Sequence, residues 1–270
     1  MPTTLASDDR YGFDNSTRDA QDQVGYLAAY LDPHTFAVLD GLDLPAAGRY
    51  ADIGAGAGTV ALWLANHGDS DGSTLVIDLQ PQHVPQHPRI DILQQDIATA
   101  ALPPASFDAI HARLLFMHLQ QREQILTNLV DALKPGGKMI ISDWATDHLD
   151  DMFIDGPDTV RQVFDDFQHT LIDVLGRGHG MDSTWARRVP AVMRSAGLQV
   201  HSGMTFNEVM HGGDAGMLLH ASNSRQKEAE LLDAGMTADE LELLREAMNN
   251  PDVLTRSWPM HTTVGVRPAA

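Results

Sequence analysis

Short apolar runs alternate with helical segments through the first half of the chain, and this alternation limits the fold more than any other feature. Expected strands cover residues 49–54, 74–79, 90–95, 107–112 and 138–144, and expected helices cover 59–67 and 120–133. Parallel neighbouring strands need crossover connections, usually helices, and such crossovers are right-handed. The pattern therefore predicts an α/β fold with a doubly wound, mostly parallel sheet.

Helical segments interrupt or flank this alternation. Four parts are expected: an N-terminal helical arm and lid over 1–44, a core over 45–145, a helical lid insertion over 146–183, and the rest of the core over 184–270, with a helical insert near 214–249. The first dozen residues are predicted to be a mobile arm, and a helix break is predicted at Asp32-Pro33. Strands over 198–209 and 255–266 are expected to pair antiparallel at a sheet edge, which gives seven strands with an antiparallel last one.

Charge and cysteine content exclude several functions. Among 270 residues, 37 are acidic and 18 basic, and cysteine is absent. An acidic chain does not favour binding to nucleic acid, and disulfides, thiolate nucleophiles and Cys-ligated metals are impossible. No apolar run approaches the ~18 residues of a membrane span, and the first residues carry no secretory signal. We expect a cytoplasmic protein that binds a small molecule and neither membrane nor nucleic acid.

A glycine-rich turn follows the first expected strand, in the sequence Asp52-Ile-Gly-Ala-Gly-Ala-Gly58-Thr59. Glycines let the backbone approach a ligand closely, and the next helix presents free N–H groups. A dinucleotide fingerprint starting at Gly54 would need glycine where Thr59 stands. Asp52 would also repel a pyrophosphate. The turn therefore favours a ligand with an ammonium or sulfonium charge, although a plain tight connection is the simpler alternative.

Two further carboxylates end the next two strands. Asp78 can accept both hydroxyls of a ribose, and Asp96, beside Ile97, can bond an adenine amino group. Taken singly, each is more often a helix cap than a ligand-binding residue. Because parallel sheets bind ligands at the carboxyl ends of their strands, the three signals together predict a nucleoside site.

Over residues 20–268, and most strongly over 50–145, these motifs resemble the class I S-adenosylmethionine-dependent methyltransferases. The Phe107-Asp108 start of the fourth strand and the Leu133-Lys-Pro-Gly-Gly137 turn are typical of that family. The resemblance implies S-adenosylmethionine as cofactor, with Gly54 and Gly56 at its methionine part, Asp78 at the ribose, Asp96 and Ile97 at the adenine, and Asp52 at the amino group. The predicted cofactor-binding residues are Asp52, Gly54, Ala55, Gly56, Asp78, Leu79, Asp96, Ile97 and Arg113.

Arg113 departs from the commonest family pattern, in which a small or amide residue often follows the fourth strand. Its guanidinium can clamp the methionine carboxylate or an acidic group of the acceptor. A salt bridge to a nearby aspartate is an equal alternative.

Acceptor-side residues are predicted from their positions after the fourth and fifth strands and on the inserts. His118 and Asp143 are the candidate general bases. Trp144, Phe164 and His179 are the candidate substrate contacts, each with core packing or a surface position as its alternative. The fourth strand ends without a carboxylate, so a metal site is not expected.

These observations predict an enzyme that transfers a methyl group to an O, N or C nucleophile of a small, hydrophobic or aromatic metabolite. It would act mainly by positioning, in the manner of small-molecule methyltransferases of bacterial secondary metabolism. The alternative is a methyltransferase-fold protein that binds the cofactor or a ligand and catalyses another reaction, such as a cyclisation. The sequence identifies neither the acceptor nor the atom methylated, and a homodimer is an open alternative to a monomer.

Overall fold

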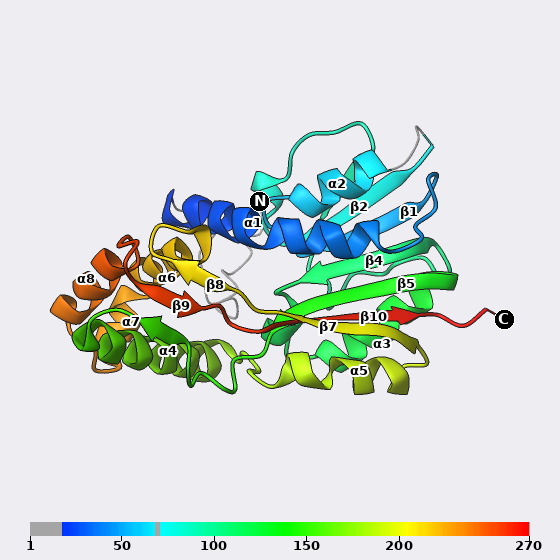
Figure 1. The fold of residues 1–270 in the computed structure, drawn as a ribbon. Coiled ribbons are helices and arrows are strands. Elements are labelled where there is room, and N and C mark those ends of the chain that lie inside the picture. The colour runs from blue at the N-terminus through cyan, green and yellow to red at the C-terminus, as the bar shows by residue number, and fades with distance from the viewer. Residues whose placement is uncertain (1–17, 68–70, 270) are drawn as a thin grey trace, which may run out of the picture.

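A seven-stranded sheet forms the centre of the computed structural model, which describes residues 18–67 and 71–269 (Figure 1). The strand order is β3-β2-β1-β4-β5-β10-β7. The first five strands in this order pair in parallel. Their bounds are β1 Arg49–Ile53, β2 Ser73–Asp78, β3 Ile90–Gln94, β4 Phe107–Arg113 and β5 Leu133–Trp144. The predicted doubly wound α/β fold is confirmed.

Strand β10 (Met260–Val266) lies between β5 and the edge strand β7 (Gln199–Phe206) and runs antiparallel to both. This confirms the predicted antiparallel last strand. The sequence predicts a turn at residues 134–137 and a strand that starts after it, at 138. In the structure β5 already begins at Leu133 and includes these residues. The end of β10 extends this pairing, because Arg267 O accepts from Gly136 N and Arg267 N donates to Gly137 O.

Each of the last two predicted strands is divided in the structure, which creates a second sheet that was not predicted. The sequence predicts one strand over 198–209, but β8 (Val209–His211) is separate from β7. Likewise 255–266 divides into β9 (Leu254–Arg256) and β10, because Pro259 lacks the N–H that would continue the ladder. The second sheet has the order β6-β9-β8, with β6 at Phe153–Asp155.

Helix α1 (Arg18–Asp40) runs without a break through Pro33, so the break predicted at Asp32-Pro33 is wrong. Proline removes one backbone hydrogen bond and costs about 3 kcal/mol in a helix interior. Leu31 and Leu39, on either side of it, are fully buried, and this burial offsets the cost. The predicted mobile arm lies outside the described residues.

Helices cover both faces of the main sheet, and a helical cap lies beyond the carboxyl ends of the parallel strands (Figure 1). The face helices are α2 Thr59–His67, α3 Arg122–Ala132 and α5 Trp185–Ser195. The cap contains α4 Asp158–His179, α6 Ala215–Gln226, α7 Glu228–Asp233 and α8 Ala238–Ala247. Helix α1 extends from the sheet to the cap, where it packs on α6. None of the described helices is both long and apolar enough to span a bilayer.

Candidate active site

The glycine turn after β1 has the backbone form that the sequence predicts. Gly54 has φ +69°, Gly56 +54° and Gly58 +70°, in the left-handed region that favours glycine. A Cβ at Gly58 would lie 2.7 Å from Pro85 Cδ, so that glycine serves packing. At Gly56, the nearest atom to such a Cβ is Val24 Cγ1 at 4.0 Å. The space above Gly56 is therefore open.

Asp52 lies on β1 beside His111 of β4, and both side chains are buried at 2% exposure. Asp52 Oδ1 and His111 Nδ1 are 2.8 Å apart. Asp52 Oδ2 and His111 Nε2 are buried without a partner in the part of the chain that the structure describes. Since buried polar atoms are nearly always hydrogen-bonded, the free oxygen of Asp52 is a place for a ligand donor.

Asp78, at the end of β2, turns back toward the glycine turn. Its Oδ2 accepts from Gly56 N at 3.2 Å and its Oδ1 from Gln80 N at 2.8 Å. Burial raises the pKa of Asp78, the Gln80 and Gly56 hydrogen bonds oppose the rise, and the nearby Asp52 charge adds to it. The structure thus brings Asp52, Asp78 and the open side of Gly56 together.

Asp96 follows β3, next to the end of β2. Gln95 N donates to Asp78 O at 3.1 Å, and Asp96 Oδ1 accepts from Ala98 N at 2.8 Å within a turn. In this described part of the chain no helix follows Asp96 before β4, so it is not a helix cap. Leu79 is 44% exposed and Ile97 is partly buried against the core. An exposed leucine at this edge is available to a flat ring.

Arg113, at the end of β4, is tied to helix α1. Its guanidinium donates to Asp32 Oδ1 at 2.9 Å and to Thr35 Oγ1 at 2.8 Å. Asp32 Oδ1 also accepts from Thr59 Oγ1, at the start of α2, at 3.1 Å. Arg113 thus forms the salt bridge to a nearby aspartate that was the alternative interpretation. Through these contacts Asp32 joins α1 to the end of β4 and to the start of α2.

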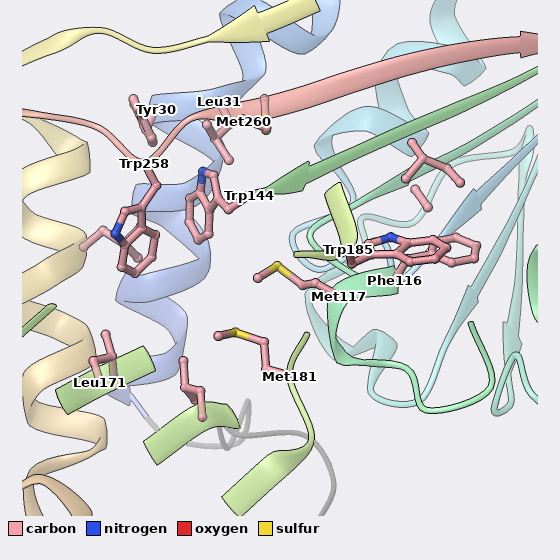
Figure 2. Close-up of a cluster of buried hydrophobic side chains, with 14 of the residues drawn as sticks. Tyr30, Leu31, Phe116, Met117, Trp144, Leu171, Met181, Trp185, Trp258 and Met260 are labelled. Atoms are coloured by element: carbon pink, nitrogen blue, oxygen red, sulfur yellow. The ribbon is translucent and has the colours of Figure 1, made fainter. Parts of the chain in front are cut away.

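A cavity lies between the ends of β4 and β5 and the helical cap. The room inside it for the centre of a water-sized sphere is about 40 Å³, so it is narrow, and about 470 Å³ is empty when the open space at its mouth is included. Figure 2 shows Met117, Met181, Trp144 and Trp258 around this region. The lining residues are Gln23, Leu27, Leu114, Met117, His118, Trp144, Thr146, Ile172, Leu175, Met181, Leu219, Asn223 and Trp258.

The cavity and the glycine turn are neighbours. Leu115, between lining residues Leu114 and Met117, has its Cδ1 3.0 Å from the Cβ position of Gly54. Val24, next to lining residue Gln23, is the side chain nearest the open side of Gly56. A ligand over the glycines and a ligand in the cavity would therefore meet near Leu115 and Val24.

The structure places the predicted acceptor-side residues in different surroundings. Trp144 lines the cavity, with its ring edge-on to Trp258 at 4.8 Å between centroids. His118, in the 3₁₀ turn η2 (Phe116–His118), also lines it. Burial, followed by the charges of Arg122 and His179, lowers the pKa of His118 to about 4. His118 is therefore neutral at pH 7.

Asp143 is fully buried, but it is not among the residues that line the cavity. Its Oδ2 accepts from Trp185 Nε1 at 3.0 Å. Burial raises the pKa of Asp143 to about 8, against the effects of this bond and of the backbone N–H groups of Met117 and Leu115. Neighbouring strand residues point to opposite faces, so Trp144 and Asp143 cannot both face the cavity. Of the two predicted bases, His118 therefore lines the cavity and Asp143 does not.

Phe164 and His179 likewise lie outside the cavity lining. Phe164 is fully buried on α4 and packs edge-on against His220, so its core alternative describes the structure. His179, at the end of α4, is 3.2 Å from both Glu230 Oε2 and Lys227 Nζ. Within the described ranges no group of three His, Asp or Glu side chains could hold a metal ion.

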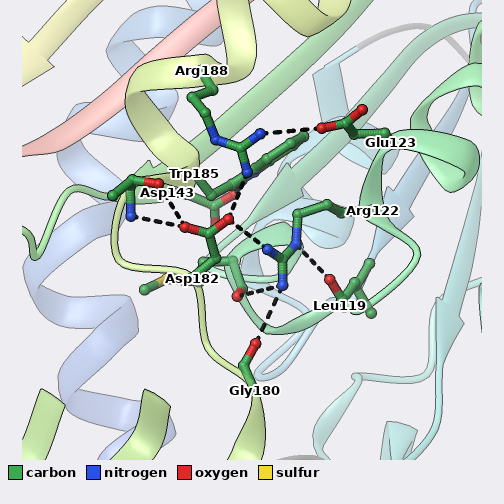
Figure 3. Close-up of polar contacts among 10 residues, drawn as sticks. Leu119, Arg122, Glu123, Asp143, Gly180, Asp182, Trp185 and Arg188 are labelled. Carbon is green, nitrogen blue, oxygen red and sulfur yellow. Dashed lines mark hydrogen bonds and ion pairs between the residues drawn. The ribbon is translucent and has the colours of Figure 1, made fainter. Parts of the chain in front are cut away.

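A charged cluster fixes the turn that carries Met117 and His118 (Figure 3). Arg122 Nη1 lies 2.7 Å and Arg188 Nη2 2.6 Å from Asp182 Oδ2. Asp182 N donates to Met117 O at 2.8 Å, and Arg122 Nη2 donates to Gly180 O at 3.3 Å. The cluster therefore holds the segment after α4, including Met181, against the turn after β4.

Several residues of this site were missed by the sequence analysis. The missed residues are Gln23, Asp32, His111, Thr146, Met181, Leu219, Asn223 and Trp258. The pairing of Asp52 with His111 follows from the register of β1 and β4, which a sequence pattern does not reveal at single-residue precision. The cavity residues come from segments far apart in sequence and carry no local motif.

Comparisons with known proteins agree with this geometry. A family described as a methyltransferase domain matches residues 51–141. The methyltransferase str2 of Strobilurus tenacellus is 35% identical over 111 residues, which are 38% of this chain and 39% of that relative. The chain thus matches about two fifths of the relative's length.

Two solved structures share the fold. Phosphoethanolamine N-methyltransferase 2 of Haemonchus contortus, in complex with phosphomonomethylethanolamine and S-adenosylhomocysteine, has a TM-score of 0.57 at 14% identity, covering 99% of this chain and 61% of that one. The [4+2]-cyclase SpnF has a TM-score of 0.54 at 16% identity, covering 88% and 81%. At such identities the likeness shows the fold alone.

The sheet order, the glycine turn and the domain match define a nucleoside-binding α/β protein with a methyltransferase domain. Residues 51–141 therefore form a methyltransferase domain on the fold of the class I S-adenosylmethionine-dependent methyltransferases, whose cofactor is S-adenosylmethionine.

Proposed function

We propose that this chain transfers the methyl group of S-adenosylmethionine to an O, N or C nucleophile of a small, hydrophobic or aromatic metabolite. The supporting observation is the cavity lined by Trp144, Trp258 and methionine and aliphatic side chains, beside the glycine turn. A cavity walled by a helical cap suits a small molecule better than a protein or nucleic acid chain. Secondary metabolism and a cytoplasmic location belong to the same proposal.

The residues around the glycine turn fit the cofactor. Gly56 has open space on its ligand side, and Asp52 Oδ2 is a buried acceptor without a partner among the described residues. We assign the amino group to Asp52, the ribose to Asp78 and the adenine to Asp96, Leu79 and Ile97. Gly54, Ala55 and Gly56 would border the methionine part. When bound, the cofactor would supply a methyl group on a positively charged sulfur. That sulfur leaves as a neutral thioether, so no acid is needed to protonate the leaving group.

The protein's main contribution is then to position the acceptor. Methyl transfer is an in-line displacement, and holding the two reactants in line lowers much of the barrier. Met117, Trp144 and Trp258 exclude water from the cavity and orient an apolar acceptor. Where the nucleophile carries a proton, neutral His118 is the group in the cavity that can accept it.

The alternative function is a reaction without methyl transfer, as a [4+2]-cyclase shares the fold. Incubation with radiolabelled S-adenosylmethionine and a panel of uncharged aromatic acceptors separates the two functions. Label in a product supports methyl transfer. Tight cofactor binding with no labelled product from any acceptor would favour the alternative, and failure to bind the cofactor would contradict the site assignment itself.

A further inference from the structure

The polar groups of the cavity differ in kind from its charged surroundings. None of the described residues that line it is Asp, Glu, Lys or Arg, although the whole chain is strongly charged. Its polar side chains are Gln23, His118, Thr146 and Asn223. The lining residues Trp144 and Trp258 add two indole N–H groups, both buried and unpaired among the described residues. A phosphate or carboxylate is normally bound by Arg, Lys or a set of backbone N–H groups. The lining therefore suits an uncharged ligand.

Gln23 and Asn223 form a buried amide pair across the cavity wall, joining α1 to α6. Gln23 Nε2 donates to Asn223 Oδ1 at 2.7 Å, and the residues are 4% and 3% exposed. Each amide thereby uses one of its two polar ends. Within residues 18–67 and 71–269, no other group pairs with Gln23 Oε1 or Asn223 Nδ2.

These two remaining atoms have opposite hydrogen-bonding roles. Gln23 Oε1 accepts and Asn223 Nδ2 donates, and the 2.7 Å bond between the two amides links the side chains that carry them. Neither is among the fully enclosed unpaired atoms, and both residues line the cavity. Thr146 Oγ1, on the same cavity, is enclosed and unpaired among the described residues. Buried polar groups left without hydrogen-bond partners are uncommon, so we expect a ligand to provide the missing partners.

We propose that the acceptor is an uncharged, largely aromatic molecule that presents a hydrogen-bond donor next to a hydrogen-bond acceptor, and that Gln23 and Asn223 recognise this pair. The proposal rests on the proposed function in one respect, that the cavity is the acceptor site. The acceptor's N–H or O–H would donate to Gln23 Oε1, and its carbonyl oxygen would accept from Asn223 Nδ2. The rings of Trp144 and Trp258 would pack against its apolar part.

The lactam 2-quinolone is a suitable probe, because it is uncharged and aromatic and places an N–H beside a carbonyl. Its N-methyl derivative keeps the carbonyl and removes the donor, and quinoline-2-carboxylate introduces a negative charge. Titration calorimetry of the full chain, with S-adenosylhomocysteine present, measures the binding of each. We expect 2-quinolone to bind ~10-fold more tightly than N-methyl-2-quinolone, the effect of one hydrogen bond, and the carboxylate to bind more weakly still.

Two variants test the assignment to residues. Gln23→Leu and Asn223→Leu should each weaken 2-quinolone binding ~10-fold and remove the preference over the N-methyl derivative. Gln168→Leu is the matched control, because Gln168 is also a buried amide of the cap, with Nε2 3.3 Å from His220 Nδ1, but does not line the cavity. It should leave 2-quinolone binding unchanged.

Equal binding of the two lactams to the wild-type chain would overturn the proposal without depending on whether any variant folds. So would unchanged binding in both Leu variants, or no binding of 2-quinolone at millimolar concentration while S-adenosylhomocysteine still binds. Failure of S-adenosylhomocysteine to bind would instead contradict the proposed function. The two failures are therefore distinguishable.

Discussion

The proposed cofactor half and the proposed acceptor half of the site are built in different ways. The cofactor half comes from the ends of three consecutive strands, and its carboxylates are Asp52, Asp78 and Asp96. The cavity is assembled from residues between Gln23 and Trp258, on α1, η2, β5, α4, α6 and the segment between β9 and β10. One half is local in sequence and the other is not.

This difference separates what the two halves can tolerate. The glycine turn needs left-handed backbone and open space at one residue, so a single side chain there blocks it. The cavity is bounded by many side chains from separate elements, so single changes reshape it without removing it. Substitutions should therefore have large effects on cofactor binding and graded effects on acceptor binding.

The largest expected effect is that of Gly56→Val. The new side chain would enter the open space above Gly56, and cofactor affinity should fall by about 3 kcal/mol or more. Gly197→Val is the control, because Gly197 also has a positive φ, +92°, with no atom near its Cβ position, but lies in the turn before β7. Both variants should lose similar stability, but only Gly56→Val should lose cofactor binding in calorimetry. Equal cofactor affinity in the two would refute the placement of the ligand.

His118→Ala should lower kcat by ~10²-fold for an acceptor with an ionisable O–H or N–H, with the cofactor Kd unchanged. Because the pKa of His118 is lowered to about 4, kcat/KM of the wild type should stay level from pH 7.5 to 5.5, where an ordinary histidine would titrate. Steady-state kinetics across this range measures both. An intact kcat in the variant would show that His118 is not the base.

Asp78→Ala should weaken cofactor binding by ~1–3 kcal/mol, the cost of leaving charged hydrogen bonds unmade. Asp78→Asn keeps one acceptor oxygen and should lose less. Equilibrium dialysis with labelled S-adenosylmethionine measures the difference in affinity. A thermal melt of each variant checks that the chain still folds without the hydrogen bond from Gly56 N to Asp78. An Ala variant with wild-type affinity would exclude the ribose role.

Asp143 gives the smallest effect, on stability. Its pKa is raised from 3.8 to about 8 in the folded chain, so the folded state holds a proton that the unfolded state has lost. The contribution of Asp143 to the free energy of unfolding is therefore fully present below pH 3.8 and is lost as the pH rises to about 8. Between pH 6.5 and 8 the loss is about 2 kcal/mol. In Asp143→Asn this part of the fall should disappear, as urea unfolding at both pH values would show. Parallel curves for the two proteins would contradict the buried, protonated state.

Opposite behaviour is expected from His118 and His220, whose pKa values are both lowered to about 4 by burial. For each, the unfolded state binds a proton that the folded state excludes between about pH 6.5 and 4. Stability should therefore fall as pH drops through that window. Urea unfolding of the wild type and of His220→Gln at pH 6.5 and 4.5 measures this difference, and an equal fall in both proteins would contradict it.

The sequence predicted the sheet correctly, and it proposed the cofactor half from a local pattern. A glycine turn with strand-end carboxylates is a local pattern, and parallel strands bring such ends to one edge. The break at Pro33 was predicted wrongly because local propensity was outweighed by burial of Leu31 and Leu39. The cavity pair Gln23 and Asn223 are 200 residues apart. Two single amides at that separation leave no signal in one sequence.

Helix α1 takes part in both halves of the site: Gln23 and Leu27 border the cavity, while Asp32 and Thr35 hold Arg113. Pro33 lies next to Asp32 and cannot donate to the carbonyl one turn earlier. One carbonyl of α1 is therefore left without its helical partner between the residues that border the cavity and Thr35. Because one helix serves both proposed halves, a substitution that displaces α1 is expected to change acceptor and cofactor binding together.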